Sequence, residues 1–210
     1  MPSTVARSGA ASRERVLRRL SRQGMARLSE LMSTGVTAAT VSRLEREGAI
    51  VRLARGLYQL PDAPLDRHHS LAEVAKLAPR GVICLVSALA FHDLTDRIPP
   101  QTWIAIGSRD WRPKFSAPPV RFVRFPPRLL ASGVATHTIE GVSVRVTTPA
   151  KTIADLFRYR KTVGLDVAVA GLKEALRQRK ANPAEIARYG VEGRVWKVIQ
   201  PYLEALTIDA

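Results

Sequence analysis

The first fifty residues alternate apolar and polar positions with a helical period. A helix that begins at Ser12 carries apolar residues on one face and arginines on the other, and it stops at the pair Gln23-Gly24. The apolar face holds Val16, Leu17 and Leu20, and the basic face holds Arg15, Arg18, Arg19 and Arg22. Such a basic face suits either a phosphate backbone or solvent, and the pattern alone favours neither.

The next segment combines two short helices with a hairpin. In Ser29–Gly48 a first helix leads through a tight turn at Gly35 to a second helix that Thr37 can cap. The second helix has Val41 and Leu44 on one face and Thr40 and Arg43 on the other. A basic β-hairpin, Ala49–Pro61, follows at once. A helix that fits the major groove, followed by a basic ribbon, is typical of a winged helix-turn-helix. Its small core is expected to consist of Leu31, Val41, Leu44, Ile50 and Tyr58.

This arrangement predicts which side chains meet DNA. The expected DNA-binding residues are Thr37, Thr40, Arg43, Arg46, Arg52 and Arg55. Arg43 is the best candidate for a bidentate contact to a guanine edge. The two threonines, near the helix N-terminus, could hold phosphate together with backbone amides. The two wing arginines, Arg52 and Arg55, are expected along the backbone or in the adjacent minor groove.

Beyond the hairpin, the pattern predicts a second domain. Helical periodicity at 68–79 and 87–94 is followed by strand-like segments at 102–107 and 120–125 and by a hairpin that turns at Glu140-Gly141. The last sixty residues are helical, with Thr148 as N-cap and Pro149 at the first helical position. The fold class is therefore α+β: an N-terminal winged helix-turn-helix followed by a mixed α/β C-terminal domain that ends in a helical segment. The expected divisions are a flexible tail (1–11), the DNA-binding domain (12–60), a linker (61–67) and a C-terminal interaction domain (68–210).

The charge balance supports a polyanionic partner. The chain of 210 residues has a formal net charge of +15 and a pI near 11.1, and such a field attracts nucleic acid whatever its sequence. Cys84, the single cysteine, excludes an intramolecular disulfide and a zinc ribbon, and its apolar surroundings indicate a buried, unreactive thiol. The apolar run 81–91 is about half of the ~20 residues that span a bilayer. Without an apolar signal core at the N-terminus, the protein is expected in the cytoplasm, with no membrane partner.

Catalytic and metal-binding patterns are sparse. His68 and His69 are adjacent, so they cannot both face one side of a regular element. The pair His92-Asp93 resembles the doublet of metal-dependent phosphohydrolases, but the further ligands that such enzymes need are missing, and a helix-end histidine beside an exposed aspartate is the better interpretation. We expect no catalytic residues, no metal, no cofactor and no enzymatic activity.

A basic, aromatic stretch occupies 107–128. Its cations form a candidate secondary basic patch of Arg109, Arg112, Lys114, Arg121 and Arg124. Basic residues interleaved with aromatics can track a phosphate backbone and stack on bases. Alternatively, Phe122 and Phe125 are core residues of an edge strand that merely exposes its arginines. We favour the second interpretation for the aromatics and leave both open for the charges.

Three segments together resemble the AbiEi-like antitoxins, transcriptional regulators of bacterial type IV toxin–antitoxin systems. They are RGLYQLP (Arg55–Pro61) in the wing, VICLVSALAFHDLTDRIPPQTWIAI (Val82–Ile106), and TTPAKTIADLFRYRKTVGLDVAVAGLKEALR (Thr147–Arg177). The resemblance covers nearly the whole chain from about Ser12 onward, and the ordered trio is its most specific part. One departure is Asp93, where the family pattern leads us to expect glycine.

The resemblance implies a repressor that binds inverted repeats in its own promoter, without a cofactor. Because the sequence has no clear coiled-coil heptad run, we expect a monomer or a weak dimer on double-stranded DNA. It also implies a neighbouring toxin of nucleotidyltransferase fold that the C-terminal domain neutralises. The alternative is a stand-alone winged-helix transcription factor whose C-terminal domain binds an effector or dimerises.

Overall fold

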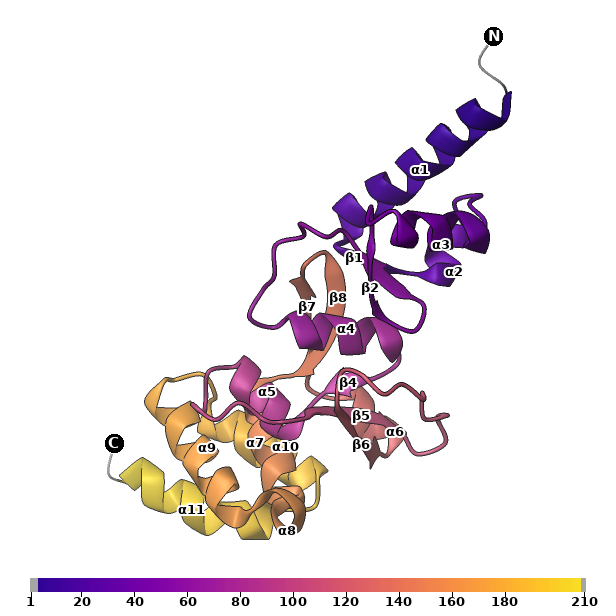
Figure 1. Ribbon diagram of the computed structural model, residues 1–210. Coiled ribbons are helices and arrows are strands. Elements are labelled where there is room, and N and C mark those ends of the chain that lie inside the picture. The colour runs from indigo at the N-terminus through magenta and orange to yellow at the C-terminus, as the bar shows by residue number, and fades with distance from the viewer. Residues whose placement is uncertain (1–3, 209–210) are drawn as a thin grey trace. The chain divides into compact units, whose positions relative to one another are not determined.

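The computed structural model describes residues 4–208, which form the expected α+β fold (Figure 1). The chain divides into two compact units. The first comprises the chain up to Pro79 together with the short segments 113–118 and 138–143. The second comprises 80–112, 119–137 and the chain from Val144 onward. Within the described part of the chain, no helix is both long enough and apolar enough to cross a membrane.

The first unit contains the helix-turn-helix and a small sheet. Its elements are α1 (Thr4–Gln23), β1 (Met25–Arg27), α2 (Leu28–Met32), α3 (Ala38–Arg46), β2 (Val51–Ala54), β3 (Leu57–Gln59) and α4 (His69–Leu77). The sheet has the order β1-β3-β2, so β3 pairs antiparallel with both neighbours. The sequence pattern did not predict β1, which adds a third strand to the hairpin.

Helix α1 begins earlier than the sequence indicated. The tail expected over 1–11 is helical from Thr4, eight residues before the predicted start at Ser12, while residues 1–3 lie outside the described part of the chain. The reason is local: the segment contains three alanines, the residue with the highest helix propensity, and no proline interrupts it. The helix therefore propagates backwards from the turns that are anchored by packing.

The predicted core of the first unit is confirmed. Leu31, Val41, Leu44, Ile50 and Tyr58 are all buried in one cluster with Val16 and Leu20 of α1. Tyr58 is 5% exposed. Helix α1 thus packs its apolar face on α3, which fixes the direction in which α3 presents its other face.

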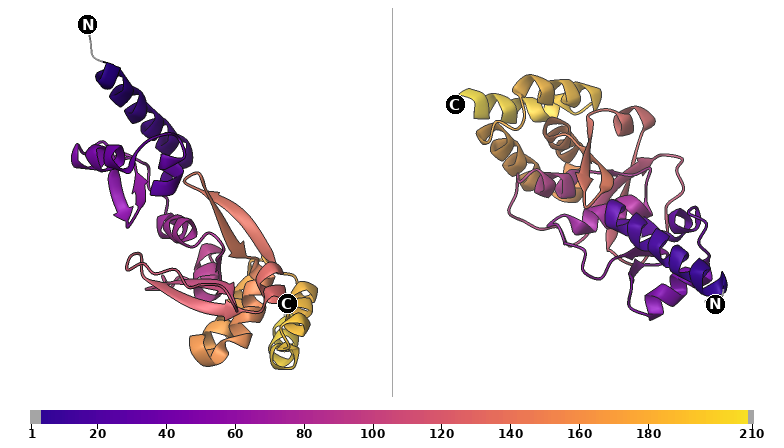
Figure 2. Two further views of the ribbon diagram at one scale, coloured as in Figure 1. Left: turned by 90° about the vertical axis from the view of Figure 1, so that its right-hand side faces the viewer. Right: turned by 90° about the horizontal axis from the view of Figure 1, so that it is seen from above.

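The second unit is a mixed five-stranded sheet with helices. Its elements are β4 (Val82–Ile83), α5 (Leu85–Phe91), β5 (Thr102–Gly107), β6 (Val120–Phe125), α6 (Pro127–Ala131), β7 (Val134–Ile139), β8 (Val142–Thr147), α7 (Pro149–Arg158), α8 (Arg160–Val163), α9 (Leu165–Arg177), α10 (Pro183–Glu192) and α11 (Trp196–Ile208). The strand order is β6-β5-β4-β8-β7, with β5 and β6 parallel, β4 and β8 parallel, and β4 and β5 antiparallel. The orange to yellow helices α9–α11 lie together in all views (Figure 2).

Helix α7 is central to the second unit. It contacts α5, α9, α10 and α11, and eight of its residues are buried. Thr148 takes the N-cap position with Pro149 next to it, as the sequence predicted. Two charged residues of α7 are buried as well: Lys151 Nζ lies 2.5 Å from each carboxylate oxygen of Asp155. Gly133 packs so closely on this site that a Cβ there would lie 2.7 Å from the Cβ of Lys151.

The boundary between the two units lies at Pro79 and not at the linker predicted over 61–67. Helix α4 packs on β1 and β3 and so belongs with the first unit. The turn of the β7–β8 hairpin is grouped there too: Glu140 accepts a 2.6 Å hydrogen bond from the Asp66 backbone N–H, and its other oxygen lies 2.8 Å from His69 Nδ1. These are long-range contacts that a local pattern does not encode.

Candidate nucleic-acid interface

The helix-turn-helix is anchored at the start of α2. Glu30 accepts a 2.6 Å hydrogen bond from the Arg27 backbone N–H, and Lys76 Nζ lies 2.9 and 3.0 Å from its two oxygens. Burial by itself would raise the pKa of Glu30, but these hydrogen bonds and the charges of Lys76 and Arg19 leave that pKa below its ordinary value. The carboxylate therefore stays ionised and ties α2 to α4 at neutral pH.

The turn into α3 is closed by glycine and threonine. Gly35 adopts a φ of +79°, which L residues rarely adopt, at the turn between the two helices. Thr37 is the N-cap: its Oγ1 accepts the Thr40 backbone N–H at 3.3 Å and lies 3.1 Å from the Thr40 hydroxyl. The cap predicted from the sequence is confirmed, and both hydroxyls are engaged in it.

The face of α3 opposite its core contacts is exposed. Its exposed residues are Ala38, Ala39, Ser42, Arg43 and Arg46, and Thr40 is half-buried. At 3.6 residues per turn, Arg46 and Ala39 lie most nearly opposite the buried pair Val41 and Leu44. Ser42 lies on this face but was not among the predicted DNA-binding residues, although its position relative to Val41 and Leu44 predicts it.

Arg43 is held at one edge of the exposed face. Its Nε lies 3.7 Å from one carboxylate oxygen of Glu47, and Arg13 Nη1 of α1 lies 3.2 Å from the other. All three side chains are about half exposed, so water screens these pairs and each contributes little to stability. Arg46 differs, since its Nε donates a 3.4 Å hydrogen bond to the Ser42 carbonyl on its own helix.

The wing is short and its tip is tethered. Strands β2 and β3 are joined through Arg55 and Gly56, and the glycine adopts a φ of +72°. The Gly56 carbonyl accepts a 2.8 Å hydrogen bond from the Leu28 backbone N–H at the start of α2. Arg52 and Arg55 are both exposed. The wing therefore presents its two cations from a ribbon of fixed position and not from a free loop.

The second basic stretch is divided between the two units. Lys114 falls in the segment grouped with the first unit, whereas Arg109, Arg112, Arg121 and Arg124 belong to the second. Two of these arginines cover aromatic rings: Arg112 lies over Phe122 at 5.0 Å and Arg121 over Trp103 at 4.3 Å, measured to the ring centroids.

Arg124 has a structural task. Its Nη1 donates to the carbonyls of Gly107, Ser108 and Asp110 at 3.0, 2.8 and 3.1 Å, which fixes the loop after β5. Phe125 is 2% exposed and belongs to the core at the end of the edge strand β6. The interpretation favoured for the aromatics is therefore confirmed for Phe125, whereas Phe122 is only half-buried and lies beneath Arg112.

The contacts of the residues considered for catalysis indicate structural roles. His92 is the C-cap of α5 beside the exposed Asp93, as expected, and its Nε2 lies 2.7 Å from the Thr147 carbonyl. Burial lowers the pKa of His92 and raises that of the Cys84 thiol well above its usual value. Among the described residues, no group of three His, Cys, Asp or Glu side chains could hold a metal ion.

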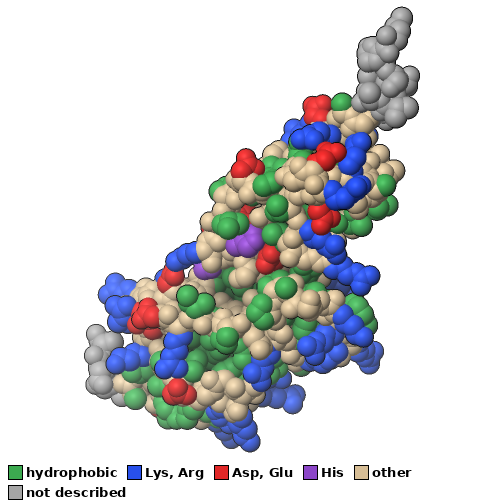
Figure 3. All heavy atoms as spheres, in the orientation of Figure 1, with side chains coloured by type: hydrophobic (Ala, Val, Ile, Leu, Met, Phe, Trp, Pro, Cys, Tyr) green, Lys and Arg blue, Asp and Glu red, His purple; other side chains and the backbone are tan. Residues whose placement is uncertain are grey.

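Surface charge does not identify the interface by itself. On the face shown in Figure 3, blue Lys and Arg side chains are distributed over both units, with fewer red carboxylates among them. The helix-turn-helix is identified instead by its geometry, because the exposed face of α3 is followed directly by the basic ribbon of β2 and β3.

Comparisons with known proteins agree with this geometry. Residues 14–61 match the family model described as "Transcriptional regulator, AbiEi antitoxin", which confirms the resemblance over the helix-turn-helix and wing. The fold is similar to that of the RV2827C protein from Mycobacterium tuberculosis, with a TM-score of 0.58 and 15% sequence identity, covering 85% of this chain and 71% of that chain. No curated protein matches the sequence.

Proposed function

We propose that the chain is a DNA-binding repressor that also serves as an antitoxin, and the match of residues 14–61 to the model of the AbiEi antitoxin family of transcriptional regulators supports this proposal. It binds double-stranded DNA at inverted repeats in its own promoter, as a monomer or weak dimer. Through its C-terminal part it neutralises a toxin of nucleotidyltransferase fold. It acts in the cytoplasm and uses no cofactor.

The observation that carries this proposal is the exposed face of α3. Helix α1 covers the opposite, apolar face of α3. When α3 enters a major groove, the side chains of Ser42, Arg43 and Arg46 therefore face the bases. Arg43 exchanges its weak pairing with Glu47 for a guanine edge, where a bidentate contact contributes about 1–3 kcal/mol of discrimination. Arg46 lies nearer the centre of the face and reaches a neighbouring base or phosphate.

The ends of the motif hold the DNA backbone. Thr37 and Thr40 close the N-terminus of α3, where the backbone amides and the helix dipole favour a phosphate. Arg52 and Arg55 extend from the wing to the backbone or the adjacent minor groove. The hydrogen bond from the Leu28 backbone N–H to the Gly56 carbonyl holds the wing at a fixed position relative to α2. The DNA contacts of α3 and of the wing therefore keep a constant spacing.

The second unit supplies a surface for a protein partner. Four of its large apolar side chains are exposed: Ile98 (91%), Trp111 (74%), Val191 (63%) and Leu165 (40%). An exposed tryptophan is a typical anchor residue of a binding interface. The exposed cations of the basic stretch, Arg109 foremost, are suited to an acidic partner or to flanking DNA.

Co-expression tests the antitoxin activity. A nucleotidyltransferase-fold toxin encoded beside this gene is induced in a bacterial host, with the wild-type chain, with a Trp111→Ala variant, or with an Arg43→Ala variant. We expect the wild-type and Arg43→Ala chains to restore growth and the Trp111→Ala chain to restore it less, because neutralisation and DNA binding use different units. Failure of the wild-type chain to restore growth would leave a stand-alone regulator.

A further inference from the structure

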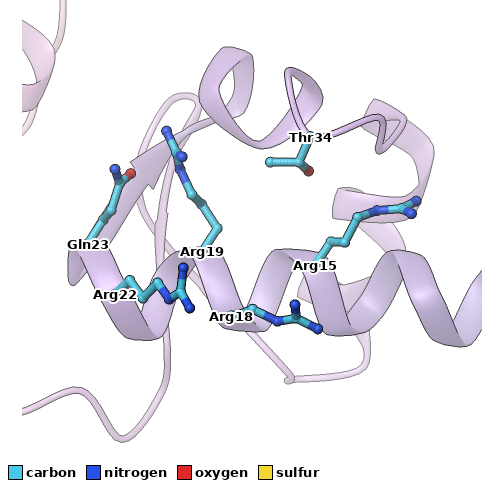
Figure 4. A pocket seen from close by; sticks show the side chains of 6 residues that line it. All are labelled: Arg15, Arg18, Arg19, Arg22, Gln23 and Thr34. Atoms are coloured by element: carbon cyan, nitrogen blue, oxygen red, sulfur yellow. The ribbon is translucent and has the colours of Figure 1, made fainter.

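A hollow lined by arginines lies along α1, outside the contacts assigned to α3 and the wing. Its volume is about 380 Å³. It is lined by Arg15, Arg18, Arg19, Arg22, Gln23 and Thr34. Figure 4 shows the four arginines and the glutamine projecting from successive turns of α1, with Thr34 facing them from the turn between α2 and α3. All six residues belong to the first unit.

The spacing of the arginines explains the hollow. Positions i, i+3, i+4 and i+7 recur on one side of a helix, so the four guanidinium groups share one side of α1 while Val16 and Leu20 hold the opposite side in the core. Four like charges at this spacing repel one another, which is unfavourable for the helix alone. Such an arrangement is stabilised when an anion lies among the charges.

The local carboxylates compensate only part of this charge. Arg18 pairs with Glu14, and Arg15 Nη2 donates to the neutral Ser12 hydroxyl at 3.0 Å. Arg19 lies near enough to Glu30 for its charge to help lower the pKa of that carboxyl, but Lys76 already neutralises Glu30. The lining therefore keeps a net positive charge.

Two polar atoms of the lining lack partners. Within residues 4–208, the buried Arg19 Nε has no hydrogen-bond acceptor and the buried Gln23 Oε1 has no donor. Buried polar atoms are nearly always hydrogen-bonded, because an unmade bond costs about 1–3 kcal/mol. An N–H donor without an acceptor, on a wall of arginines, suits an oxyanion, and the Gln23 amide oxygen suits a protonated phosphate oxygen or a hydroxyl group beside it.

We propose that this hollow is a phosphate-binding site. Guanidinium groups bind phosphate oxygens in bidentate fashion, and the Gln23 amide and Thr34 hydroxyl add neutral contacts. Two sources can supply the group: the backbone of the duplex that α3 holds, or a free phosphorylated small molecule. We expect the backbone, because Thr34 lies only three residues before the N-cap Thr37. This assignment of the source rests on the proposed DNA binding, whereas the phosphate chemistry does not.

The DNA arm of the test uses the full-length chain and a duplex of random sequence at several salt concentrations. Arg19→Gln/Arg22→Gln is compared with the wild type and with Lys173→Gln/Lys197→Gln, which removes the same charge from exposed positions in the second unit. If the backbone fills the hollow, the slope of log K against log salt becomes shallower by about 2 in the first variant only, since each phosphate contact contributes about 0.9. Arg22→Gln alone, at an exposed position that cannot disturb the core, makes the slope shallower by about 1.

The second arm omits DNA. Inorganic phosphate and pyrophosphate are titrated into the wild-type chain while the Nε–Hε NMR signal of Arg19 is followed. A saturable shift that disappears in Arg22→Gln, with unchanged DNA slopes, assigns the hollow to a free phosphorylated ligand. Unchanged slopes together with no saturable shift would overturn the proposal. Neither arm uses the promoter sequence. The preference for the promoter over random DNA is measured in a separate experiment, and its loss would contradict the repressor function but not the phosphate site.

Discussion

We expect the second unit to be less stable with the buried ion pair of α7 than with apolar side chains at the same two positions. Lys151 and Asp155 are each 2% exposed, and the ammonium nitrogen lies 2.5 Å from the carboxylate oxygens. Burial nevertheless raises the pKa of Asp155 from its usual 3.8 to about 6, because desolvation outweighs the attraction of Lys151. A rise of about two pH units corresponds to roughly 3 kcal/mol against the ionised carboxylate in the folded state.

The two partners should therefore behave very differently when they are removed singly or together. Asp155→Leu alone leaves a buried ammonium without its counter-ion, and we expect a loss of about 3–5 kcal/mol in the free energy of unfolding. Lys151→Met/Asp155→Leu removes both charges while keeping similar volume. We expect this double variant to recover the loss and to exceed the wild type by about 1–3 kcal/mol.

Urea unfolding followed by tryptophan fluorescence isolates the relevant unit. The three tryptophans, Trp103, Trp111 and Trp196, all lie in the second unit, so their emission reports its unfolding alone. A double variant that is as unstable as Asp155→Leu would refute the reasoning. It would show that the attraction between the two charges stabilises the folded state by more than their desolvation destabilises it.

The pH dependence of the same pair has a definite sign. Since the pKa of Asp155 is raised on folding, its stabilising contribution is complete below pH 3.8 and is lost as the pH rises through about 6. The advantage of the double variant over the wild type should therefore be larger at pH 7.5 than at pH 5. A gap that narrows with rising pH would contradict this assignment.

Three further predictions concern other positions. Gly133→Ala should lower the free energy of unfolding by about 2 kcal/mol or more, since the φ of Gly133 is +62° and the added Cβ would collide with Lys151. The control is Gly48→Ala, where φ is +70° but the space around the glycine is open, and it should cost only about 1 kcal/mol. Thermal denaturation followed by circular dichroism measures both variants. Arg55→Ala should weaken binding to all DNA sequences alike and make the salt slope shallower by about 1, and a sequence-dependent loss in titrations would contradict a backbone contact. Because burial depresses the pKa of His92, its contribution to stability is present above pH 6.5 and is lost as the pH falls, so the difference between wild type and His92→Gln in urea unfolding should shrink from pH 7.5 to pH 5.5.

Periodicity predicted most of the elements because their determinants are local. The cap at Thr37, the turn at Gly35 and the apolar pair Val41 and Leu44 define α3 within ten residues, and the structure reproduces them. The same locality explains the success with Thr148 at the start of α7. Each of these features depends on local φ/ψ preferences and on the spacing of apolar residues along one helix face, and both can be predicted directly from the sequence.

Features that depend on distant partners could not be predicted in this way. Strand β1 has only three residues, and it exists because β3 offers a free edge. The position of Glu140 beside Asp66 and His69 joins residues more than seventy positions apart. Likewise, the arginines of α1 were visible in the sequence, but that Thr34 faces them became clear only when the helix-turn-helix was assembled.

Binding of the full-length chain to its own upstream DNA, compared with random DNA of equal length at two salt concentrations, tests the central claim most directly. We predict a preference for the promoter that survives at the higher salt and disappears in Arg43→Ala, because base contacts carry specificity while phosphate contacts carry the salt dependence. Equal affinities that fall together as salt rises would contradict the account, since the charge of +15 would then act only as a non-specific attraction.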